Sequence, residues 1–308
     1  MTRVAVIGSG AFGTALATVL ARGGLPVTLW GRDQTQLAAM ASEGENRRYL
    51  PGIALPEALQ FGPWTDADLI LLALPAQQLR GFLAVNPLTA PVITLSKGID
   101  LTTGALPHDL AGAAAVISGP GFAAELATGL PTALSLASRD AELGARMQET
   151  LSTGALRLYL TDDMTGVGLG GALKNVYAIA CGMAVGAGLG ESARAALMTR
   201  GFAEMQRLGA ALGAAPETLT GLSGLGDLAL SCTSDRSRNF AHGQRLGAAQ
   251  NTRGGTVEGI ATAQALLSLA PGLDLPIARA VADVLEARTD VAGALRALMS
   301  RPLKREDD

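Results

Sequence analysis

One lysine stands alone among apolar and small residues, which makes it the first candidate for chemistry. From Thr165 to Gly190 the sequence reads TGVGLGGALKNVYAIACGMAVGAGLG, and Lys174 is its only charged residue. Removing an ammonium group from water lowers its pKa, so such a lysine can exchange protons near neutral pH. The alternative is a structural lysine whose long side chain reaches solvent from a core helix.

The same stretch is long enough to cross a bilayer, but its composition argues against that interpretation. It contains eight glycines besides Lys174 and Asn175, and it lacks aromatic belts at its ends. A helix that is apolar on all sides is also typical of the centre of a globular domain. We therefore predict a core helix over 165–186 and no integral membrane segment.

The overall composition fits a globular protein and excludes several classes of function. The chain has 308 residues, of which 48% are hydrophobic, enough for one large or two ordinary domains. A net charge of −3 and 4% aromatic residues provide neither a basic surface nor a base-stacking platform. We therefore expect no nucleic acid partner.

Cysteine and histidine are scarce, which limits metal and acid–base chemistry. The two cysteines, Cys181 and Cys232, form no disulfide framework, and with His108 and His242 they show no metal-ligand spacing. The N-terminal sequence lacks the long apolar stretch and cleavage site of a signal peptide. We expect a cytoplasmic protein with no metal site.

A glycine-rich turn lies between the first predicted strand and the first predicted helix. Val4–Ile7 is a continuous apolar run, typical of a strand buried on both faces, and a helix is predicted over 14–22. In the intervening GSGAFG, Gly8 permits the tight turn, Gly10 lets a pyrophosphate approach the backbone, and Gly13 permits close helix packing. This unit predicts a dinucleotide site, and a glycine turn without a ligand is the alternative.

The residues after the second predicted strand, over 27–30, bear on which dinucleotide is used. A carboxylate at this point binds the ribose 2′-hydroxyl of NAD, whereas an arginine accommodates the 2′-phosphate of NADP. The sequence here is Gly31-Arg32-Asp33. Because Arg32 comes first we favour NADP(H), while Asp33 leaves NAD(H) open.

Further buried strands are followed by polar or glycine-rich residues. Strands are predicted over 69–74, 92–95, 116–117 and 132–137. The carboxyl edge of a parallel sheet is where ligands bind, and Lys97 lies directly after one of these strands. Lys97 is therefore placed to meet an anion, and a solvated loop lysine is the alternative.

The second half of the chain shows helical periodicity. Apolar segments are predicted as helices over 165–186, 191–212, 216–230, 240–246, 257–269, 276–287 and 291–299. The predicted fold is α/β: a Rossmann-type doubly wound sheet followed by an all-helical C-terminal domain. We place the NAD(P)-binding domain at 1–162 and the helical substrate-binding and catalytic domain at 163–308.

Two polar features of the helical half could complete a site. Asp227 lies in GLGDL and could pair with Lys174, or simply cap a helix. The segment SCTSDRSRN at 231–239 contains Arg236 and Arg238 among hydroxyl residues. Guanidinium groups match phosphate oxygens, so this segment could bind a phosphate, and a solvated loop is the alternative.

A set of motifs in fixed order connects these features to a known family. They are GSGAFGTALA near the N-terminus, LSKGID at 95–100, SGPGFAAE at 118–125, LGGALKNVYAIACGM at 169–183, GLSGLGDL at 221–228, TSDRSRN at 233–239 and TVEGI at 256–260. Over nearly its full length the chain resembles bacterial NAD(P)-dependent glycerol-3-phosphate dehydrogenase. The resemblance implies reversible reduction of dihydroxyacetone phosphate to sn-glycerol 3-phosphate, for phospholipid synthesis. The expected partner is this phosphorylated triose, and the expected assembly is a homodimer.

The resemblance also implies roles for individual residues. The catalytic residues would be Lys174 as proton donor and acceptor, Asp227 and Lys97. The cofactor residues would be Gly8, Gly10, Ala11, Phe12, Gly13, Arg32, Asp33, Lys97, Ala123, Arg238, Val257 and Glu258. The substrate residues would be Lys97, Gly119, Gly121, Lys174, Asp227, Ser237, Arg238 and Asn239.

The chain departs from the family pattern at two of these positions. The family usually has Ser or Thr where this chain has Gly121, and often Ser where it has Ala11. Each change removes a side-chain hydroxyl, while backbone contacts can persist.

Two other functions remain as alternatives. One is a related reductase with a catalytic lysine, such as a ketopantoate reductase or a β-hydroxyacid dehydrogenase. The other is a non-catalytic dinucleotide sensor, which would need the glycine turn but neither Lys174 nor Asp227.

Overall fold

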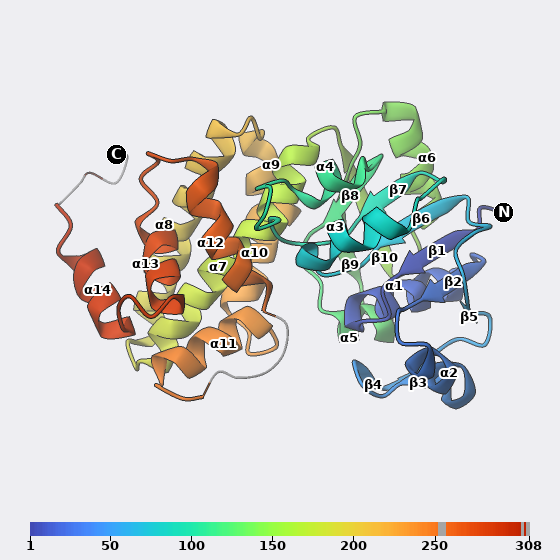
Figure 1. Ribbon diagram of the computed structural model, residues 1–308, viewed down its shortest axis with the longest axis horizontal. Coiled ribbons are helices and arrows are strands. Elements are labelled where there is room, and N and C mark those ends of the chain that lie inside the picture. The colour runs from blue at the N-terminus through green and yellow to red at the C-terminus, as the bar shows by residue number, and fades with distance from the viewer. Residues whose placement is uncertain (252–256, 303–304, 306–308) are drawn as a thin grey trace.

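The protein consists of a sheet-containing N-terminal half and a helical C-terminal half that lie side by side (Figure 1). The computed structural model describes residues 1–251, 257–302 and 305. Thr256, the first residue of the TVEGI motif, lies outside the described residues. In the described part of the chain every element after the last strand is a helix, which confirms the predicted fold class.

Eight strands form the main sheet, in the order β10-β9-β8-β7-β6-β1-β2-β5. All neighbouring pairs are parallel except β8 and β9. A separate two-stranded sheet pairs β3 with β4. The strands are β1 Val4–Ile7, β2 Val27–Trp30, β3 Glu45–Asn46, β4 Leu50–Ala54, β5 Gln60–Phe61, β6 Leu69–Leu72, β7 Val92–Thr94, β8 Ala115–Ser118, β9 Thr132–Ala137 and β10 Leu156–Thr161.

Helices cover both faces of the central strands, as the continuous apolar strand sequences predict. Alternate residues of β1 enter different cores: Val4 and Val6 contribute to one hydrophobic cluster, and Ala5 and Ile7 to another. Each face is thereby removed from water. The helices of this half are α1 Ala11–Arg22, α2 Gln34–Glu43, α3 Ala76–Val85, α4 Pro107–Ala111, α5 Ala123–Thr128 and α6 Ala141–Leu151.

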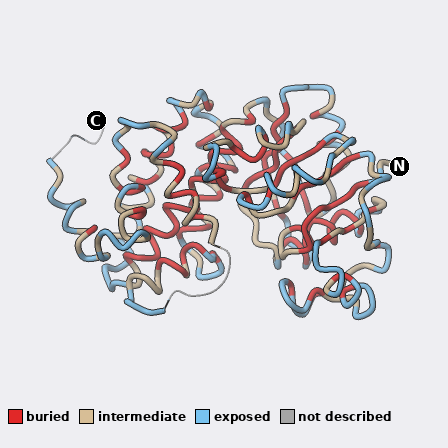
Figure 2. Tube along the Cα trace, in the orientation of Figure 1, coloured by how far each residue is buried: buried red, intermediate tan, exposed pale blue. Residues whose placement is uncertain are grey.

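The C-terminal half is organised around α7, which is buried along most of its length (Figure 2). By length and composition α7 could cross a membrane, but 94% of its most apolar 18-residue window is buried inside the protein. It begins after Asp163, whose side chain accepts a hydrogen bond from the Gly166 amide at 2.7 Å. The helices are α7 Met164–Gly186, α8 Gly190–Ala211, α9 Pro216–Thr220, α10 Asp227–Cys232, α11 Arg238–Gly247, α12 Glu258–Leu269, α13 Pro276–Leu285 and α14 Val291–Met299.

One expected helix, over 216–230, is divided in the structure. It consists of α9, a π-helical turn η1 (Leu222–Gly226) and α10. A β-carbon on Gly224 would lie 1.9 Å from the carbonyl oxygen of Leu219, so only glycine fits this turn. A helix interrupted by a π-turn is often found at functional sites, and here Asp227 is the first residue after it.

Small residues bring α11 unusually close to α7. A β-carbon on Gly243 would lie 2.1 Å from the carbonyl oxygen of Ile179, and one on Gly182 would lie 2.1 Å from that of Phe240. The two backbones therefore touch where larger side chains would separate them. This contact fixes the start of α11, and with it Arg238 and Asn239, relative to α7.

We expect Gly243→Ala to destabilise the protein by about 1–3 kcal/mol, because the added methyl group must displace the backbone of α7. Gly81→Ala in α3 is the matched control, since nothing lies within 4 Å of its β-carbon position. There the better helix propensity of alanine predicts unchanged or slightly higher stability, by up to about 1 kcal/mol. Urea unfolding of both variants measures the difference. Equal stability of the two would contradict the close helix contact.

Candidate active site

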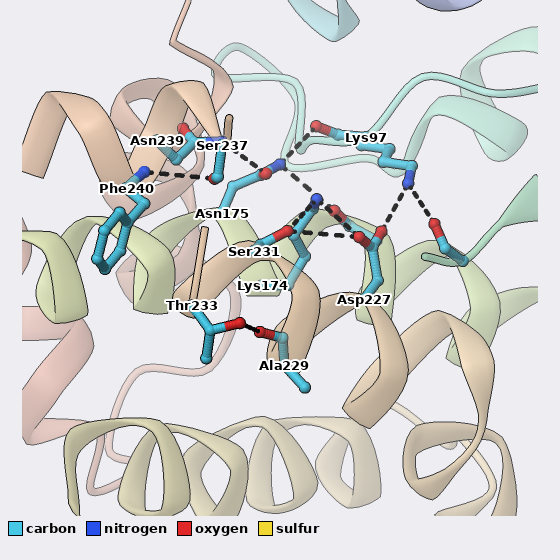
Figure 3. A network of polar contacts seen from close by, with 12 residues as sticks. Lys97, Lys174, Asn175, Asp227, Ala229, Ser231, Thr233, Ser237, Asn239 and Phe240 are labelled. Carbon is cyan, nitrogen blue, oxygen red and sulfur yellow. Dashed lines mark hydrogen bonds and ion pairs between the residues drawn. The ribbon is translucent and has the colours of Figure 1, made fainter. Parts of the chain in front are cut away.

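A single buried carboxylate joins two lysines from different parts of the chain (Figure 3). The Oδ1 atom of Asp227 lies 3.0 Å from Lys174 Nζ, and its Oδ2 atom lies 2.6 Å from Lys97 Nζ. Lys174 comes from the middle of α7, whereas Lys97 comes from the loop after β7. The Asp227 side chain is 2% exposed, and those of Lys174 and Lys97 are 12% and 19% exposed. The three charges thus form one largely buried cluster between the two halves.

Each ammonium has a further fixed partner. Lys174 donates to Ser231 Oγ at 2.7 Å, one helical turn beyond Asp227, and Lys97 donates to the Gly119 carbonyl at 3.0 Å. A lysine ammonium carries three N–H groups, so these bonds use two of them on each lysine. The third N–H of each lysine has no hydrogen-bond acceptor among the residues that the structure describes. Ser231 was not among the predicted site residues.

Burial and mutual attraction set the protonation of this cluster. Burial lowers the pKa of Lys174 below its ordinary value; the charge of Asp227 opposes this effect, and the charge of Lys97 adds to it. Burial alone would raise the pKa of Asp227, but the charges of Lys174 and Lys97 outweigh it and leave this pKa below the ordinary value. The carboxylate stays ionised, and Lys174 is a stronger acid than a solvated lysine.

A second network of amides locks the surrounding segments together. Asn175 donates to the backbone carbonyls of Lys97 and Gly171, both at 3.3 Å, and accepts from Asn239 Nδ2 at 2.7 Å. The Asn239 oxygen accepts from the Gly259 amide at 3.0 Å. Within the described part of the chain, the second N–H of Asn239 Nδ2 has no acceptor, and the substrate contact expected of Asn239 stays a prediction. Asn175 was not predicted, although it is the other polar residue beside Lys174 in the apolar run.

The glycine-rich turn has the geometry that a dinucleotide site requires. Gly8 has φ +125°, and a β-carbon there would lie 2.6 Å from the Ala73 carbonyl oxygen. A β-carbon on Gly13 would lie 2.0 Å from the Gly8 carbonyl oxygen, whereas nothing occupies the space within 4 Å of the β-carbon position of Gly10. Gly8 and Gly13 are thus required by the turn itself, and Gly10 leaves room for a ligand. The residues present fit a dinucleotide.

The turn is also directed toward the lysine–aspartate cluster. The Phe12 ring, in the first turn of α1, lies with its centroid 5.9 Å from Lys97 Nζ. Ala11 is the first residue of the same helix. The buried side-chain amide of Asn46 also contacts the turn. It donates to the Ser9 carbonyl at 3.0 Å and to Thr14 Oγ1 at 2.8 Å. Asn46 is therefore a supporting residue that the glycine pattern alone did not reveal.

Arg32 and Asp33 follow β2 and are exposed. Asp33 Oδ1 caps α2 by accepting from the Gln36 amide at 3.0 Å, and its Oδ2 lies 3.6 Å from Arg48 Nη1. The carboxylate that could have bound a ribose hydroxyl thus already has two partners. Arg48, which was not predicted, adds a second cation at this position.

The segment after β8 lies against Lys97. Gly119 has φ +147°, which favours glycine, and its carbonyl oxygen is the Lys97 acceptor described above. A β-carbon on Gly121 would lie 3.1 Å from Thr132 Cγ2, so the Ser or Thr typical of the family would be crowded here. Ala123 follows as the first residue of α5.

The remaining predicted residues lie at two helix starts. Ser237 caps α11, its hydroxyl accepting from the Phe240 amide at 3.4 Å, and Arg238 is the exposed first residue of that helix. Val257 precedes α12 and Glu258 begins it. Burial raises the pKa of the Glu258 carboxyl group. A hydrogen bond with the Ala76 backbone and the charge of Arg238 both act to lower it, but burial has the larger effect.

Glu258 reaches the Lys97 loop as well. A β-carbon on Gly98 would lie 3.1 Å from Glu258 Oε2. The structure therefore gathers Lys97, Lys174, Asp227 and Asn239 in one network, with Glu258 beside the same loop. Arg32 and Asp33 stand apart from it, at the end of β2.

Comparison with known proteins identifies the family. The N-terminal model of NAD-dependent glycerol-3-phosphate dehydrogenase matches residues 3–144, and the C-terminal model matches residues 163–296. The glycerol-3-phosphate dehydrogenase NAD(P)+ of Paracoccus denitrificans is 54% identical over 318 residues, covering 98% of this chain and 99% of that protein. The enzyme of that name from Cereibacter sphaeroides is 51% identical over 319 residues, covering 98% and 100%.

A solved structure supports the same family. The crystal structure of glycerol-3-phosphate dehydrogenase from Coxiella burnetii has a TM-score of 0.91 at 36% identity, covering 97% of this chain and 99% of that chain. The chain belongs to the NAD-dependent glycerol-3-phosphate dehydrogenase family.

Proposed function

We propose that this protein reversibly reduces dihydroxyacetone phosphate to sn-glycerol 3-phosphate. NADP(H) is the favoured cofactor, and NAD(H) is the alternative. The observation that carries the proposal is the buried Asp227 that holds Lys174 and Lys97 together beside the glycine-rich turn. The product would supply phospholipid synthesis.

Lys174 is the proposed acid and base of the reaction. The bound nicotinamide cofactor would supply or accept the hydride. In the reduction, Lys174 donates a proton from Nζ to the oxygen at C2, and in the reverse direction its neutral amine takes that proton back. Asp227 and Ser231 hold Nζ in place through the 3.0 Å and 2.7 Å contacts. Because burial lowers the pKa of Lys174, the proton is more readily released.

Lys97 and the start of α11 are the proposed substrate clamp. Lys97 helps to neutralise negative charge on the substrate, and Arg238 and Asn239 bind its phosphate. Fixing the phosphate determines which face of the ketone meets the cofactor. Gly119, Gly121 and Ser237 would line the same region.

The residues proposed to hold the cofactor come from six segments of the chain. The pyrophosphate would lie against the amides of the turn and the start of α1. Arg32 would contact the 2′-phosphate of NADP. The full set is Gly8, Gly10, Ala11, Phe12, Gly13, Arg32, Asp33, Lys97, Ala123, Arg238, Val257 and Glu258.

We further propose a domain boundary at 162/163 and a cytoplasmic homodimer. The boundary is supported by the end of β10 at Thr161 and the start of α7 at Met164.

The test of the reaction compares wild type with Lys174→Ala, by following NADPH oxidation with dihydroxyacetone phosphate or ketopantoate. Wild type should turn over only the phosphorylated triose. Lys174→Ala should lose at least ~10²-fold in kcat, the contribution of a positioned acid–base group, while still binding NADPH. Arg146→Ala on α6 is the control. Near wild-type turnover in Lys174→Ala would exclude the assigned role, and turnover of ketopantoate would favour the related reductase.

The cofactor preference has its own test. Arg32→Ala should reduce kcat/KM for NADPH by about 10- to 100-fold, the effect of losing a hydrogen bond to a charged group, and should change kcat/KM for NADH far less. Steady-state kinetics with both cofactors measure this. Equal losses for NADPH and NADH would argue against a 2′-phosphate contact at Arg32.

A further inference from the structure

The loop that leads into α11 is tied to the N-terminal half at a point outside the lysine–aspartate cluster. Arg236 Nη1 forms an ion pair with Glu125 Oε1 of α5. The same guanidinium lies over the Phe122 ring, 5.9 Å from its centroid. From the sequence both arginines of this loop were candidates for a phosphate. The structure instead gives Arg236 a protein partner in the other half.

Both ends of this contact continue directly into the proposed substrate site. Arg236 lies two residues before Arg238, and the Ser237 amide donates to the Ser234 carbonyl at 3.0 Å, which turns the chain into α11. On the other side, Glu125 lies in α5, which follows the segment that begins with Gly119. The Gly119 carbonyl accepts from Lys97. The ion pair therefore joins the segment beside Lys97 to the segment that presents Arg238.

The solvent exposure of the Arg236–Glu125 pair limits how much the pair can contribute to stability. The Arg236 side chain is 64% exposed and that of Glu125 is 38% exposed. An ion pair this exposed changes the equilibrium constant between two states of a protein by up to about five-fold. That is too little to account for the stability of the fold. A five-fold change is enough, however, to alter the populations of two conformations of neighbouring segments when these differ little in free energy.

We propose that Arg236 and Glu125 form an interdomain latch, which holds the loop before α11, and with it Arg238 at the start of that helix, against the N-terminal half. This inference rests on the proposed function, because the loop leads into the start of α11, which is part of the proposed substrate clamp. The latch acts through the loop and touches no reacting atom. When the latch is broken, fewer molecules have the clamp in place before substrate arrives, so apparent affinity for dihydroxyacetone phosphate falls. Once substrate is bound the clamp is closed in either case, so kcat stays unchanged.

Kinetics of four variants test the latch. Arg236→Ala and Glu125→Gln should each raise KM for dihydroxyacetone phosphate by about two- to five-fold with little change in kcat. The reversed pair Glu125→Arg/Arg236→Glu should restore KM toward wild type. Arg146→Ala, which breaks an exposed pair with Glu142 on α6, is the control and should leave KM unchanged.

Two kinetic outcomes would overturn the latch. KM values that match the control in both single variants would show that the pair has no role. A raised KM in Arg236→Ala that the reversed pair does not restore, with Glu125→Gln normal, would show that Arg236 contacts the substrate phosphate directly.

Amide hydrogen exchange tests the latch without catalysis. Amides over 233–240 should exchange faster in Arg236→Ala than in wild type, and Arg146→Ala should not change them. Unchanged exchange in Arg236→Ala would contradict the latch. If wild type failed to reduce dihydroxyacetone phosphate, the proposed function would fall, and the exchange result would still decide whether the two halves are joined here.

Discussion

A buried carboxylate that needs two cations is the constraint on which the rest of the structure depends. Asp227 is almost wholly removed from water, and an ionised carboxylate in that position is stable only with charged, hydrogen-bonded partners. Lys174 and Lys97 supply them from opposite halves of the protein. The same contact therefore joins the two halves and opposes the effect of burial on the pKa of Lys174. The contacts of Asp227 with Lys174 and Lys97 thus serve both the packing of the two halves and the proposed chemistry.

Small residues make this arrangement possible. A β-carbon on Gly170 would lie 2.5 Å from the Ser223 carbonyl oxygen, and one on Gly171 would lie 2.4 Å from Ser118 Oγ. These two glycines precede Lys174 by one helical turn, so they let η1 and β8 approach α7 closely. Larger residues would move Asp227 and Lys97 away from Lys174. The high glycine content of α7, which argues against a membrane span, is what lets this helix lie at the centre of the candidate site.

Much of the fold and the main site pair could be predicted because local sequence determines them. The strands over 4–7, 27–30 and 132–137 have the predicted bounds, because each is a short, largely apolar run with a glycine or a proline next to at least one of its ends. Lys174 and Asp227 were identified because each is a lone charge among apolar residues. The π-turn that divides 216–230 was missed, because it depends on a tertiary approach to α7. Asn175, Ser231, Arg48 and the Glu125–Arg236 pair were missed because their roles depend on distant partners that no local pattern records.

The most direct test of the central claim is the pKa of Lys174 with and without its carboxylate partner. The sequence contains only three lysines, Lys97, Lys174 and Lys304, so NMR of side-chain-labelled lysine gives few signals to assign. In wild type the Lys174 signal should titrate below the ordinary lysine value, and in Asp227→Asn its pKa should fall further, because the charge of Asp227 raises it. Glu142→Gln, on the exposed face of α6, is the control. An ordinary pKa for Lys174 in wild type would contradict the effect of burial, and no decrease in Asp227→Asn would contradict the opposing effect of the Asp227 charge.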